Sequence, residues 1–350
     1  MDRDTVGLFI RSLHAVSDED EAWSRLQSNP RPYIAEFQDA RVIRGSRIVV
    51  TKDGMACSDE LVFGQRHFRS PPKDKSMSIN KRGLLEVDPL EYAEQWIPAG
   101  VHLTCEYQHN YFHWISEILA RLYLFERMTD DKSVPLLITD GLHPNLYALL
   151  DLVRASERPV IRMTDGVCYR VGRLTYPSDV SRNVESEKCI PSHASMFVPA
   201  GLIKAMVSEL EARVPKSGRE FPKKLYLVRN RSWRIPVNQE DVASLLARHE
   251  FTQIDLATVS ALDQIEMFSS AEQIVAPSGA TCSNILWMRG GTHAIVLTSD
   301  HPFFVCPYWD AFARSSAVNL SYLISPRMGY RDTAHDDFEV DLSALEAAIL

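Results

Sequence analysis

The chain has 350 residues, 45% of them hydrophobic, and its 46 acidic residues outnumber its 38 basic ones. This length exceeds one compact core and predicts two domains, while the acidic balance argues against a dedicated nucleic-acid-binding protein. The first residues show no basic region followed by an apolar stretch, and no run approaches the ~18 apolar residues of a membrane span. We therefore expect a cytoplasmic protein without a signal peptide or a transmembrane helix.

The first hundred residues predict a small α/β extension. Residues 1–30 look helical and polar, residues 40–64 alternate enough for two or three antiparallel strands, and residues 65–85 read as an exposed loop. Asp18-Glu19-Asp20 matches DxD, a pattern that can hold a nucleotide-bound metal. We interpret it instead as the acidic first turn of a helix, because negative charge is favourable at a helix N-terminus. Six cysteines without a CxxC spacing predict reduced core residues rather than disulfides. They are Cys57, Cys105, Cys168, Cys189, Cys282 and Cys306.

From about residue 100 the pattern changes to alternating strands and helices, which indicates a parallel sheet with crossover helices. A polar, irregular stretch at 178–193 follows this first block and reads as a linker. The strands predicted before the linker are 101–107, 135–140, 159–164 and 167–177, and the helices are 110–128 and 144–154.

A second alternating block follows a helix predicted at 195–213 and has the pattern of a doubly wound half-domain. Its predicted strands are 224–229, 252–256, 273–276 and 293–298. Two predicted helices begin at caps formed by Asn238 and Ser260, and a third lies at 281–288. Two such halves are expected to leave a cleft between them. The predicted domains are residues 1–190 (extension 1–99, Rossmann-like part 100–190), residues 191–334, and a tail helix at 335–350.

The helix predicted from residue 110 carries a polar line on an otherwise apolar surface. At about 100° per residue, Asn110, His113, Glu117 and Arg121 fall within roughly 80° of one another. Because such groups need a partner or a cleft when the helix is buried, the line predicts acid–base chemistry on an anionic substrate. The alternative is an ordinary ion pair between Glu117 and Arg121 beside a satisfied histidine.

A zinc site is a further alternative for the same helix. His109 and His113 are spaced i,i+4, and Glu117 lies one turn beyond, so the three could act as ligands. Asn110 stands where the HExxH motif needs its glutamate, so that motif is absent. We therefore predict no metal at this site.

Two features of the second block lie at carboxyl ends of strands, where open α/β sheets bind ligands. The loop Pro277-Ser278-Gly279-Ala280-Thr281 opens a helix, and its small residues let backbone N–H groups approach an anion. Arg229, Arg231 and Arg234 follow another strand, and guanidinium groups match phosphate oxygens. A tight turn and a solvated charge run are the alternatives. Together the features predict a diphosphate site.

With these regions together, the chain resembles glycosyltransferase family 61. The resemblance covers about residues 100–300, and the tail from His335 also looks like bacterial members. Three segments carry it in order and spacing: Asn110-Tyr-Phe-His-Trp-Ile-Ser-Glu-Ile-Leu-Ala-Arg121, Leu225-Tyr-Leu-Val-Arg-Asn-Arg-Ser-Trp-Arg234, and Phe268 to Thr292 with Pro277-Ser-Gly-Ala-Thr-Cys-Ser-Asn284 inside it.

The resemblance implies an α/β protein of GT-B architecture, in which the second of two Rossmann-like halves holds a nucleotide-sugar donor. It implies an inverting transferase of bacterial capsular or surface polysaccharide assembly, with no cofactor and no essential metal. The implied partners are the nucleotide-sugar and a saccharide or lipid-linked saccharide acceptor, without nucleic acid. Peripheral association at the inner membrane and a homodimer are further expectations.

Two departures from the family pattern lie in the helix-opening loop. The family loop usually reads Pro-His-Gly-Ala-Gly, whereas this chain has Ser278 and Thr281 in place of the histidine and the second glycine. These changes predict either a different donor or altered or lost activity. A catalytically degenerate module that binds nucleotide-sugars or glycans is therefore the alternative function. Ala120 also replaces a common proline.

These features predict the roles of individual residues. Glu117 is the first candidate for the general base and His113 the second, while Arg121 and Asn110 support them. Donor-binding residues contribute guanidinium groups, small side chains or backbone N–H groups to the leaving diphosphate. They are Arg229, Arg231, Arg234, Ser278, Gly279, Ala280, Thr281 and Asn284.

Overall fold

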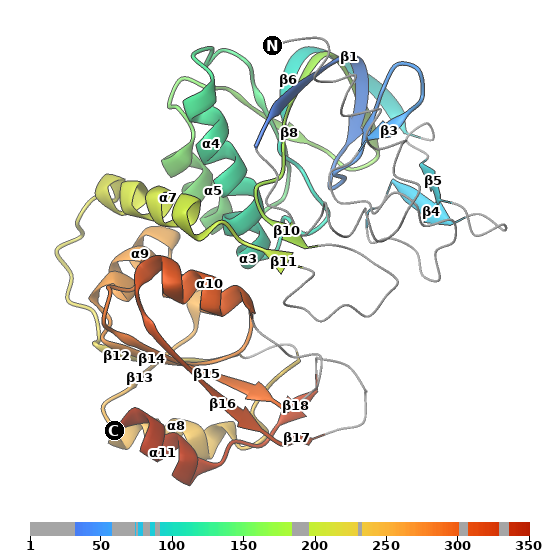
Figure 1. Cartoon of the computed structure of the whole chain (residues 1–350). Coiled ribbons are helices and arrows are strands. Elements are labelled where there is room, and N and C mark those ends of the chain that lie inside the picture. Colours follow the sequence, from blue (N-terminus) through green and yellow to red (C-terminus); the bar gives the residue numbers. More distant parts are fainter. Residues whose placement is uncertain are drawn as a thin grey trace. The chain divides into compact units, whose positions relative to one another are not determined.

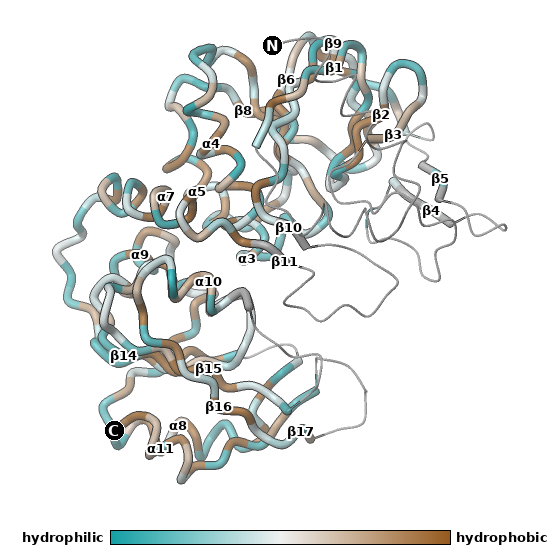
Figure 2. Tube along the Cα trace, in the orientation of Figure 1, coloured by the Kyte–Doolittle hydropathy of each residue, from teal (hydrophilic) through white to brown (hydrophobic). Residues whose placement is uncertain are grey.

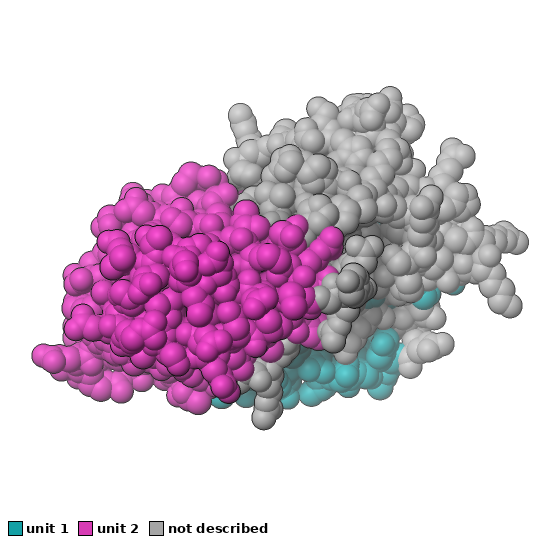
Figure 3. Space-filling view, turned by 90° about the horizontal axis from the view of Figure 1, so that it is seen from below, with its two compact units in different colours: residues 1–190, 194–197 teal, residues 191–193, 198–350 magenta. Residues whose placement is uncertain are grey.

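The computed structural model describes residues 32–57, 74, 76–79, 85–87, 92–183, 196–229, 233–300, 307–328 and 336–350 (Figure 1). The chain divides into two compact units (Figure 3): unit 1 is residues 1–190 with 194–197, and unit 2 is residues 191–193 with 198–350. The helix predicted at 1–30 and most of the loop predicted at 65–85 lie outside the described residues.

Unit 1 is built on a mixed sheet of strand order β3-β2-β1-β9-β6-β7-β8. The pairs β9–β6, β6–β7 and β7–β8 are parallel. The pairs β1–β9, β1–β2 and β2–β3 are antiparallel. The strands are β1 (Ile34–Ile43), β2 (Val49–Val50), β3 (Ala56–Cys57), β6 (Ala93–His102), β7 (Leu136–Thr139), β8 (Val160–Met163) and β9 (Val167–Pro177).

The antiparallel strands predicted at 40–64 are therefore confirmed, but they share one sheet with the parallel strands. The expected boundary at residues 99 and 100 falls inside β6, which begins at Ala93 instead of residue 101. At the end of the loop predicted at 65–85, β4 (Met77–Ile79) pairs antiparallel with β5 (Leu85–Val87). The sequence did not predict these strands, because alternation in such short segments is too weak to detect.

The inner face of this sheet forms the core of unit 1. Along β1, buried residues alternate with more exposed ones, as expected of a strand with one covered face. Phe37 of β1 and Tyr176 of β9 meet edge to face at 6.3 Å between ring centroids. The helical segments of unit 1 are α3 (Tyr111–His113), η1 (Trp114–Leu119), α4 (Ala120–Met128) and α5 (Pro144–Val153).

Unit 2 contains a sheet of strand order β13-β12-β14-β15-β16 whose described strands are all parallel. In chain order this is 2-1-3-4-5, the flavodoxin-like order, in which the direction of winding reverses between the first and third strands. The strands are β12 (Lys224–Leu227), β13 (Thr252–Ile254), β14 (Gln273–Pro277), β15 (His293–Ser299) and β16 (Asn319–Ser325). The middle of β15 is drawn as hydrophobic in Figure 2, as expected of a strand buried on both faces.

Helices cover both faces of this sheet (Figure 1). One layer contains α9 and α10, and the other contains α8 and α11. Their bounds, with those of the preceding helix and the short helical turns, are α7 (Ala200–Arg213), α8 (Gln239–Arg248), η2 (Leu256–Thr258), α9 (Ala261–Ser270), η3 (Ala280–Trp287), α10 (Pro307–Ser316) and α11 (Leu342–Ile349).

The predicted caps of unit 2 have different outcomes. Ser260 caps α9 as predicted, since its hydroxyl accepts a hydrogen bond from the Asp263 N–H. Asn238 occupies the position before α8, but its side chain bonds both backbone groups of Val340 instead of capping the helix. The helix predicted at 281–288 is a 3₁₀-helix that begins at Ala280.

The structure confirms an α/β protein. Four of the six cysteines lie in the described part of the chain, where Cys57, Cys105, Cys168 and Cys282 are free and buried. Among the described residues, no helix is both long enough and apolar enough to span a bilayer.

The tail helix α11 belongs to the core of unit 2, and this position generates a stability prediction. Leu345 is fully buried beside Leu246 of α8 and Ile295 of β15. Leu345→Ala should lower the free energy of unfolding by about 2–5 kcal/mol, because it leaves a cavity. Ser343→Ala, on the exposed side of the same helix, should change it by less than about 0.5 kcal/mol in matched denaturant titrations. Equal values for the two variants would contradict this packing.

Candidate active site

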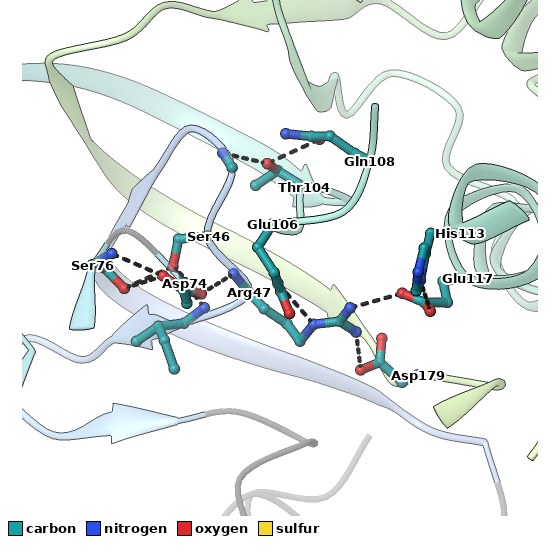
Figure 4. Close-up of polar contacts among 12 residues, drawn as sticks. Ser46, Arg47, Asp74, Ser76, Thr104, Glu106, Gln108, His113, Glu117 and Asp179 are labelled. Atoms are coloured by element: carbon teal, nitrogen blue, oxygen red, sulfur yellow. Dashed lines mark hydrogen bonds and ion pairs between the residues drawn. The ribbon is translucent and has the colours of Figure 1, made fainter. Parts of the chain in front are cut away.

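A buried arginine lies at the centre of the ionisable groups of unit 1 (Figure 4). Arg47 donates to Glu117 Oε2 at 2.7 Å, to Asp179 Oδ2 at 2.8 Å and, through Nε, to Glu106 Oε2 at 3.3 Å. The Arg47 side chain is only 3% exposed. A guanidinium can remain charged at this depth because carboxylates surround it in fixed geometry.

Distant segments bring these groups together. Arg47 lies in the loop between β1 and β2, Glu106 follows β6, and Asp179 follows β9. Because β6 and β9 are parallel neighbours, with Val101 beside Thr175, the residues after them emerge at one edge of the sheet. Carboxyl ends of parallel strands are where open α/β sheets place their ligand sites.

Glu117 lies in a π-helical turn, η1, between the α-helical segments α3 and α4. Within this turn the Ser116 hydroxyl donates to the Phe112 carbonyl at 2.8 Å, and the Ser181 hydroxyl donates to the Ser116 carbonyl. These bonds occupy carbonyls that an α-helix would use, which favours a local departure from α-helical bonding. Such π turns are frequent at functional sites.

The backbone beside Arg47 is fixed by a second buried carboxylate. Asp74 Oδ2 accepts hydrogen bonds from the Arg47 N–H and the Ser46 hydroxyl, both at 2.9 Å, and Asp74 Oδ1 accepts from Ser76. These bonds hold the loop between β1 and β2 in one conformation. The guanidinium of Arg47 is thereby positioned before any substrate binds.

His113 is the histidine of this cluster, and Glu117 orients it. Nδ1 of His113 and Oε1 of Glu117 are 2.5 Å apart, and the imidazole stacks on Tyr107 at 4.6 Å between ring centroids. The His113 side chain is 12% exposed, whereas that of Glu117 is 2% exposed. Among the described residues, none forms a hydrogen bond with Nε2 of His113. With Nδ1 bonded to a carboxylate, Nε2 is the ring nitrogen that can accept a proton.

The carboxylates of the cluster have opposite pKa shifts. Burial alone would raise the pKa of Glu117, but His113 and Arg47 outweigh it, and the pKa is lowered. Burial is likewise outweighed at Asp179, where Arg47 and Arg121 lower the pKa. At Glu106 burial prevails over Arg47, and Asp74 and Glu117 add to it, so the pKa is raised. Glu117 and Asp179 therefore stay ionised more readily than Glu106.

The predicted supporting residues have other roles. Arg121 donates to Asp179 Oδ1 at 2.6 Å and to the His102 carbonyl at 3.1 Å, so its contacts differ from the ordinary ion pair with Glu117 that was the alternative interpretation of this helix. Asn110 caps the helix by accepting a hydrogen bond from the Phe112 N–H at 2.9 Å. Burial, followed by nearby Arg121, lowers the pKa of His102 to about 3 and keeps its imidazole neutral.

The residues considered for zinc are not arranged together. His109 is exposed in the turn before α3, while His113 is directed toward Glu117. Within the described ranges, no group of three or more histidine, cysteine, aspartate or glutamate side chains could hold a metal ion.

The second candidate site lies in unit 2, where the winding of the sheet reverses. Arg229 follows the carboxyl end of β12, and its Nη1 donates to the carbonyl of Ser278, which follows β14, at 2.6 Å. Because β12 and β14 are adjacent parallel strands, the reversal point lies between them. In sheets of this order the ligand crevice opens there.

Gly279 allows the arginine to lie across this loop. A Cβ atom at residue 279 would overlap the Arg229 guanidinium, so a side chain here would force the guanidinium to move. The first hydrogen bond of η3 is donated by Cys282 to the Gly279 carbonyl at 2.8 Å. The N–H groups of Ala280 and Thr281 therefore precede the first helical bond and have no acceptor within the helix, the arrangement that binds anions.

The remaining donor-site candidates fall into three groups. The Ser278 hydroxyl is buried and accepts a hydrogen bond from Trp309 Nε1 at 3.2 Å, while Asn284 donates to the Thr281 carbonyl at 3.1 Å. These two side chains thus support the loop. Arg234 is half-buried in a left-handed conformation, with φ of 64°. Arg231 lies outside the described residues.

The surroundings of Arg229 destabilise its positive charge, which a bound anion would stabilise. Burial first, and then the like charge of Arg234, lowers the pKa of Arg229 to about 10, and Asp337 acts in the opposite direction. The charged form is therefore costly in the free protein. A phosphate group would favour the charged form, because opposite charge stabilises a buried guanidinium.

Unit 2 is thus a parallel α/β sheet of flavodoxin-like order with basic groups at its reversal point, the position where sheets of this class bind ligands. The profile of the family described as Glycosyltransferase 61 matches residues 111–295, which is more than half of the chain. The chain therefore belongs to glycosyltransferase family 61, and this membership implies glycosyltransferase activity. A comparison with curated proteins gave no match.

Sequence reasoning missed Arg47, Glu106 and Asp179. Asp179 lies in the stretch predicted as a linker, but residues 178–181 are buried. Asp179 is separated from Arg47 by 132 positions along the chain, so no local spacing reveals the contact. The available signal was positional: Glu106 and Asp179 each follow a strand.

The buried ion pairs generate a prediction about stability and pH. Asp179→Asn should lower the free energy of unfolding by about 3–5 kcal/mol near neutral pH, because it leaves buried guanidinium charge uncompensated. Asp151→Asn is the control, since its pair with Arg154 leaves the aspartate side chain 59% exposed; its effect should stay below about 1 kcal/mol.

The sign of the pH dependence follows from the lowered pKa values of Glu117 and Asp179. Their contribution is present above the unfolded-state pKa of about 4 and is lost as the pH falls through the folded-state values. Wild-type stability should therefore decline on acidification more steeply than that of Asp179→Asn. Denaturant titrations at several pH values measure both slopes, and parallel slopes would contradict the assignment.

Proposed function

We propose that this protein is an inverting glycosyltransferase that moves a sugar from a nucleotide-sugar donor to a hydroxyl of a saccharide acceptor. The observation that carries the proposal is that the family match includes residues of both candidate sites. It contains His113 and Glu117 near its start and the loop from Ser278 to Thr281 toward its end. A GT-B-like arrangement of the units, with domain boundaries as expected from the sequence, is part of this proposal.

The donor is assigned to unit 2. Arg229 and Arg234 supply positive charge where negative charge develops on the leaving diphosphate, and the N–H groups at the start of η3 add hydrogen bonds. The loop keeps the small residues that let a diphosphate approach the backbone. This support holds despite Ser278 and Thr281, because Ser278 contacts the arginine through its carbonyl group, which any residue provides.

Proton transfer is assigned to unit 1, with His113 as the proton acceptor and Glu117 as the residue that orients it. This order reverses the ranking from the sequence. Glu117 has one oxygen bonded to His113 and the other to Arg47, and its lowered pKa makes it a weak base. Its negative charge would instead stabilise the imidazolium that forms on His113.

In the proposed step the acceptor oxygen attacks C1 of the donor sugar from the side opposite the diphosphate. The new C1–O bond forms as the bond to the leaving oxygen breaks, and the electron pair of that bond leaves with the nucleoside diphosphate. The acceptor proton passes to Nε2 of His113. The step needs no cofactor, and its charges are balanced by the guanidinium groups beside the diphosphate and by Glu117.

The cellular setting is part of the proposal and rests on the family. Bacterial surface-polysaccharide assembly, a cytoplasmic protein peripheral to the inner membrane, a lipid-linked acceptor and a homodimer are its finer elements. A degenerate binding module is the alternative, motivated by Ser278 and Thr281. Binding of a nucleotide without transfer to any acceptor would favour that alternative.

Variants of the proton-accepting pair test the proposed function. His113→Gln should lower kcat about 10²–10⁴-fold, the usual contribution of a general base, with nucleotide binding retained. Glu117→Gln should also lower kcat, because the imidazolium would lose its negative partner. The measurement is transfer from a panel of nucleotide-sugars, alongside thermal shifts with the same nucleotides. His143→Gln, at an exposed helix cap, is the control, and unchanged kcat in His113→Gln would overturn the assignment.

The donor site is tested at Gly279. Gly279→Ala should displace the Arg229 guanidinium and weaken nucleoside diphosphate binding about tenfold or more, because one charge-assisted contact of about 1.4 kcal/mol or more is lost. Gly201→Ala is the matched control, since a Cβ there meets open space in α7 of the same unit. Thermal shifts with nucleoside diphosphates measure the difference. Equal affinities for both variants would place the diphosphate elsewhere.

A further inference from the structure

Glu106 is a buried ionisable group that the proposed mechanism does not use. It follows β6 in the loop that leads to the active-site helix, and its side chain is 8% exposed. Its contact with Arg47 is 3.3 Å, longer than the contacts that Glu117 and Asp179 make with the same guanidinium. With His113 it belongs to the less buried part of the cluster.

Within the described part of the chain, the charges of the cluster leave Glu106 only a shared cation, Arg47, at the longest of that guanidinium's three carboxylate contacts. Among the described residues, Arg47 and Arg121 face the ionised carboxylates of Glu117 and Asp179, and Asp74 adds another carboxylate beside the Arg47 backbone. An ionised Glu106 would add negative charge where negative charge is already in excess. Like charges at this separation oppose simultaneous ionisation, so the carboxyl group with the weakest contact keeps a proton most readily.

We infer that Glu106 is a neutral carboxylic acid at neutral pH and that it donates a hydrogen bond to an oxygen atom of the bound acceptor saccharide. This inference rests on the proposed function for the identity of the acceptor. Glu106 would orient the acceptor, while His113 takes the proton. A neutral acid is a strong donor in a shielded site, and its O–H can reach a hydroxyl or ring oxygen that carries no charge.

The raised pKa of Glu106 agrees with this role, and burial is its largest cause. The charged groups around it act in both directions: Arg47 lowers the pKa, whereas Asp74 and Glu117 raise it. Ionisation at alkaline pH would remove the donated hydrogen bond and put a negative charge against the acceptor oxygen. Acceptor binding should therefore weaken as the pH rises through the pKa of Glu106.

Infrared spectroscopy tests the ionisation without any need for activity. The wild-type protein at neutral pH should show the C=O stretch of a protonated carboxylic acid, and Glu106→Gln should lose that band. Glu126→Gln is the matched control, because Glu126 also pairs with an arginine, Arg158, and has a lowered pKa; the band should persist there. A wild-type spectrum without an acid band at neutral pH, or a band that survives in Glu106→Gln, would overturn the inference.

Kinetics test the contact with the acceptor. Glu106→Ala should raise the acceptor KM about tenfold, the loss expected of one hydrogen bond of about 1.4 kcal/mol. Glu106→Gln keeps an N–H donor, so its acceptor KM should lose the rise with pH that the wild type shows. A fall in kcat of about 10²-fold in Glu106→Gln with unchanged acceptor KM would make Glu106 a base and overturn the inference. Absence of transfer in the wild type would instead count against the proposed function, while the infrared result stands.

Discussion

The active-site cluster of unit 1 depends on one buried guanidinium. Arg47 binds Glu117, Asp179 and Glu106 at once, and its own backbone is held by Asp74. Burying such charges is favourable only when every one of them meets a partner in fixed geometry. The cluster is therefore cooperative, because displacing one segment leaves charge uncompensated in the others. The conformation of the loop between β1 and β2 and that of the helical segment after β6 therefore depend on each other through the ion pair of Arg47 with Glu117.

The two candidate sites use the same physical rule in different ways. In unit 1, a carboxylate that pairs with an arginine also bonds one ring nitrogen of a histidine; in unit 2, an arginine crosses a glycine to reach the carbonyl group of Ser278. Both lie just past the carboxyl ends of parallel strands. In the proposed function, the first arrangement accepts a proton and the second binds the diphosphate. A transferase that forms a glycosidic bond needs both functions, and this is why the proposed function assigns one to each unit.

Local features of the sequence predicted much of this structure. In unit 2, periodicity located β12 to β15, α8, α9 and η3 within a few residues, but α10 and β16 were not predicted and the tail helix begins at Leu342 instead of residue 335. Strand-end reasoning pointed to Arg229 and the loop at Gly279. Contacts between distant segments could not be predicted from local periodicity. Arg47 and Glu117 are 70 positions apart, and Asp179 lay in a stretch whose polarity suggested solvent. The π turn at Glu117 could not be predicted either, because apolar spacing does not distinguish it from an α-helix.

The pairing of β1 with β9 has a consequence for the order in which unit 1 folds. Ile34 lies beside Pro177 in this ladder, so the first described strand pairs with one made more than a hundred residues later. During synthesis at the ribosome, β1 must wait until β9 has emerged, and loop closure over such a separation slows folding. Until then Asp179, which follows β9, cannot pair with Arg47. The buried ion-pair cluster is therefore formed late in folding, and the edge of β1 that pairs with β9 stays unpaired in the interval.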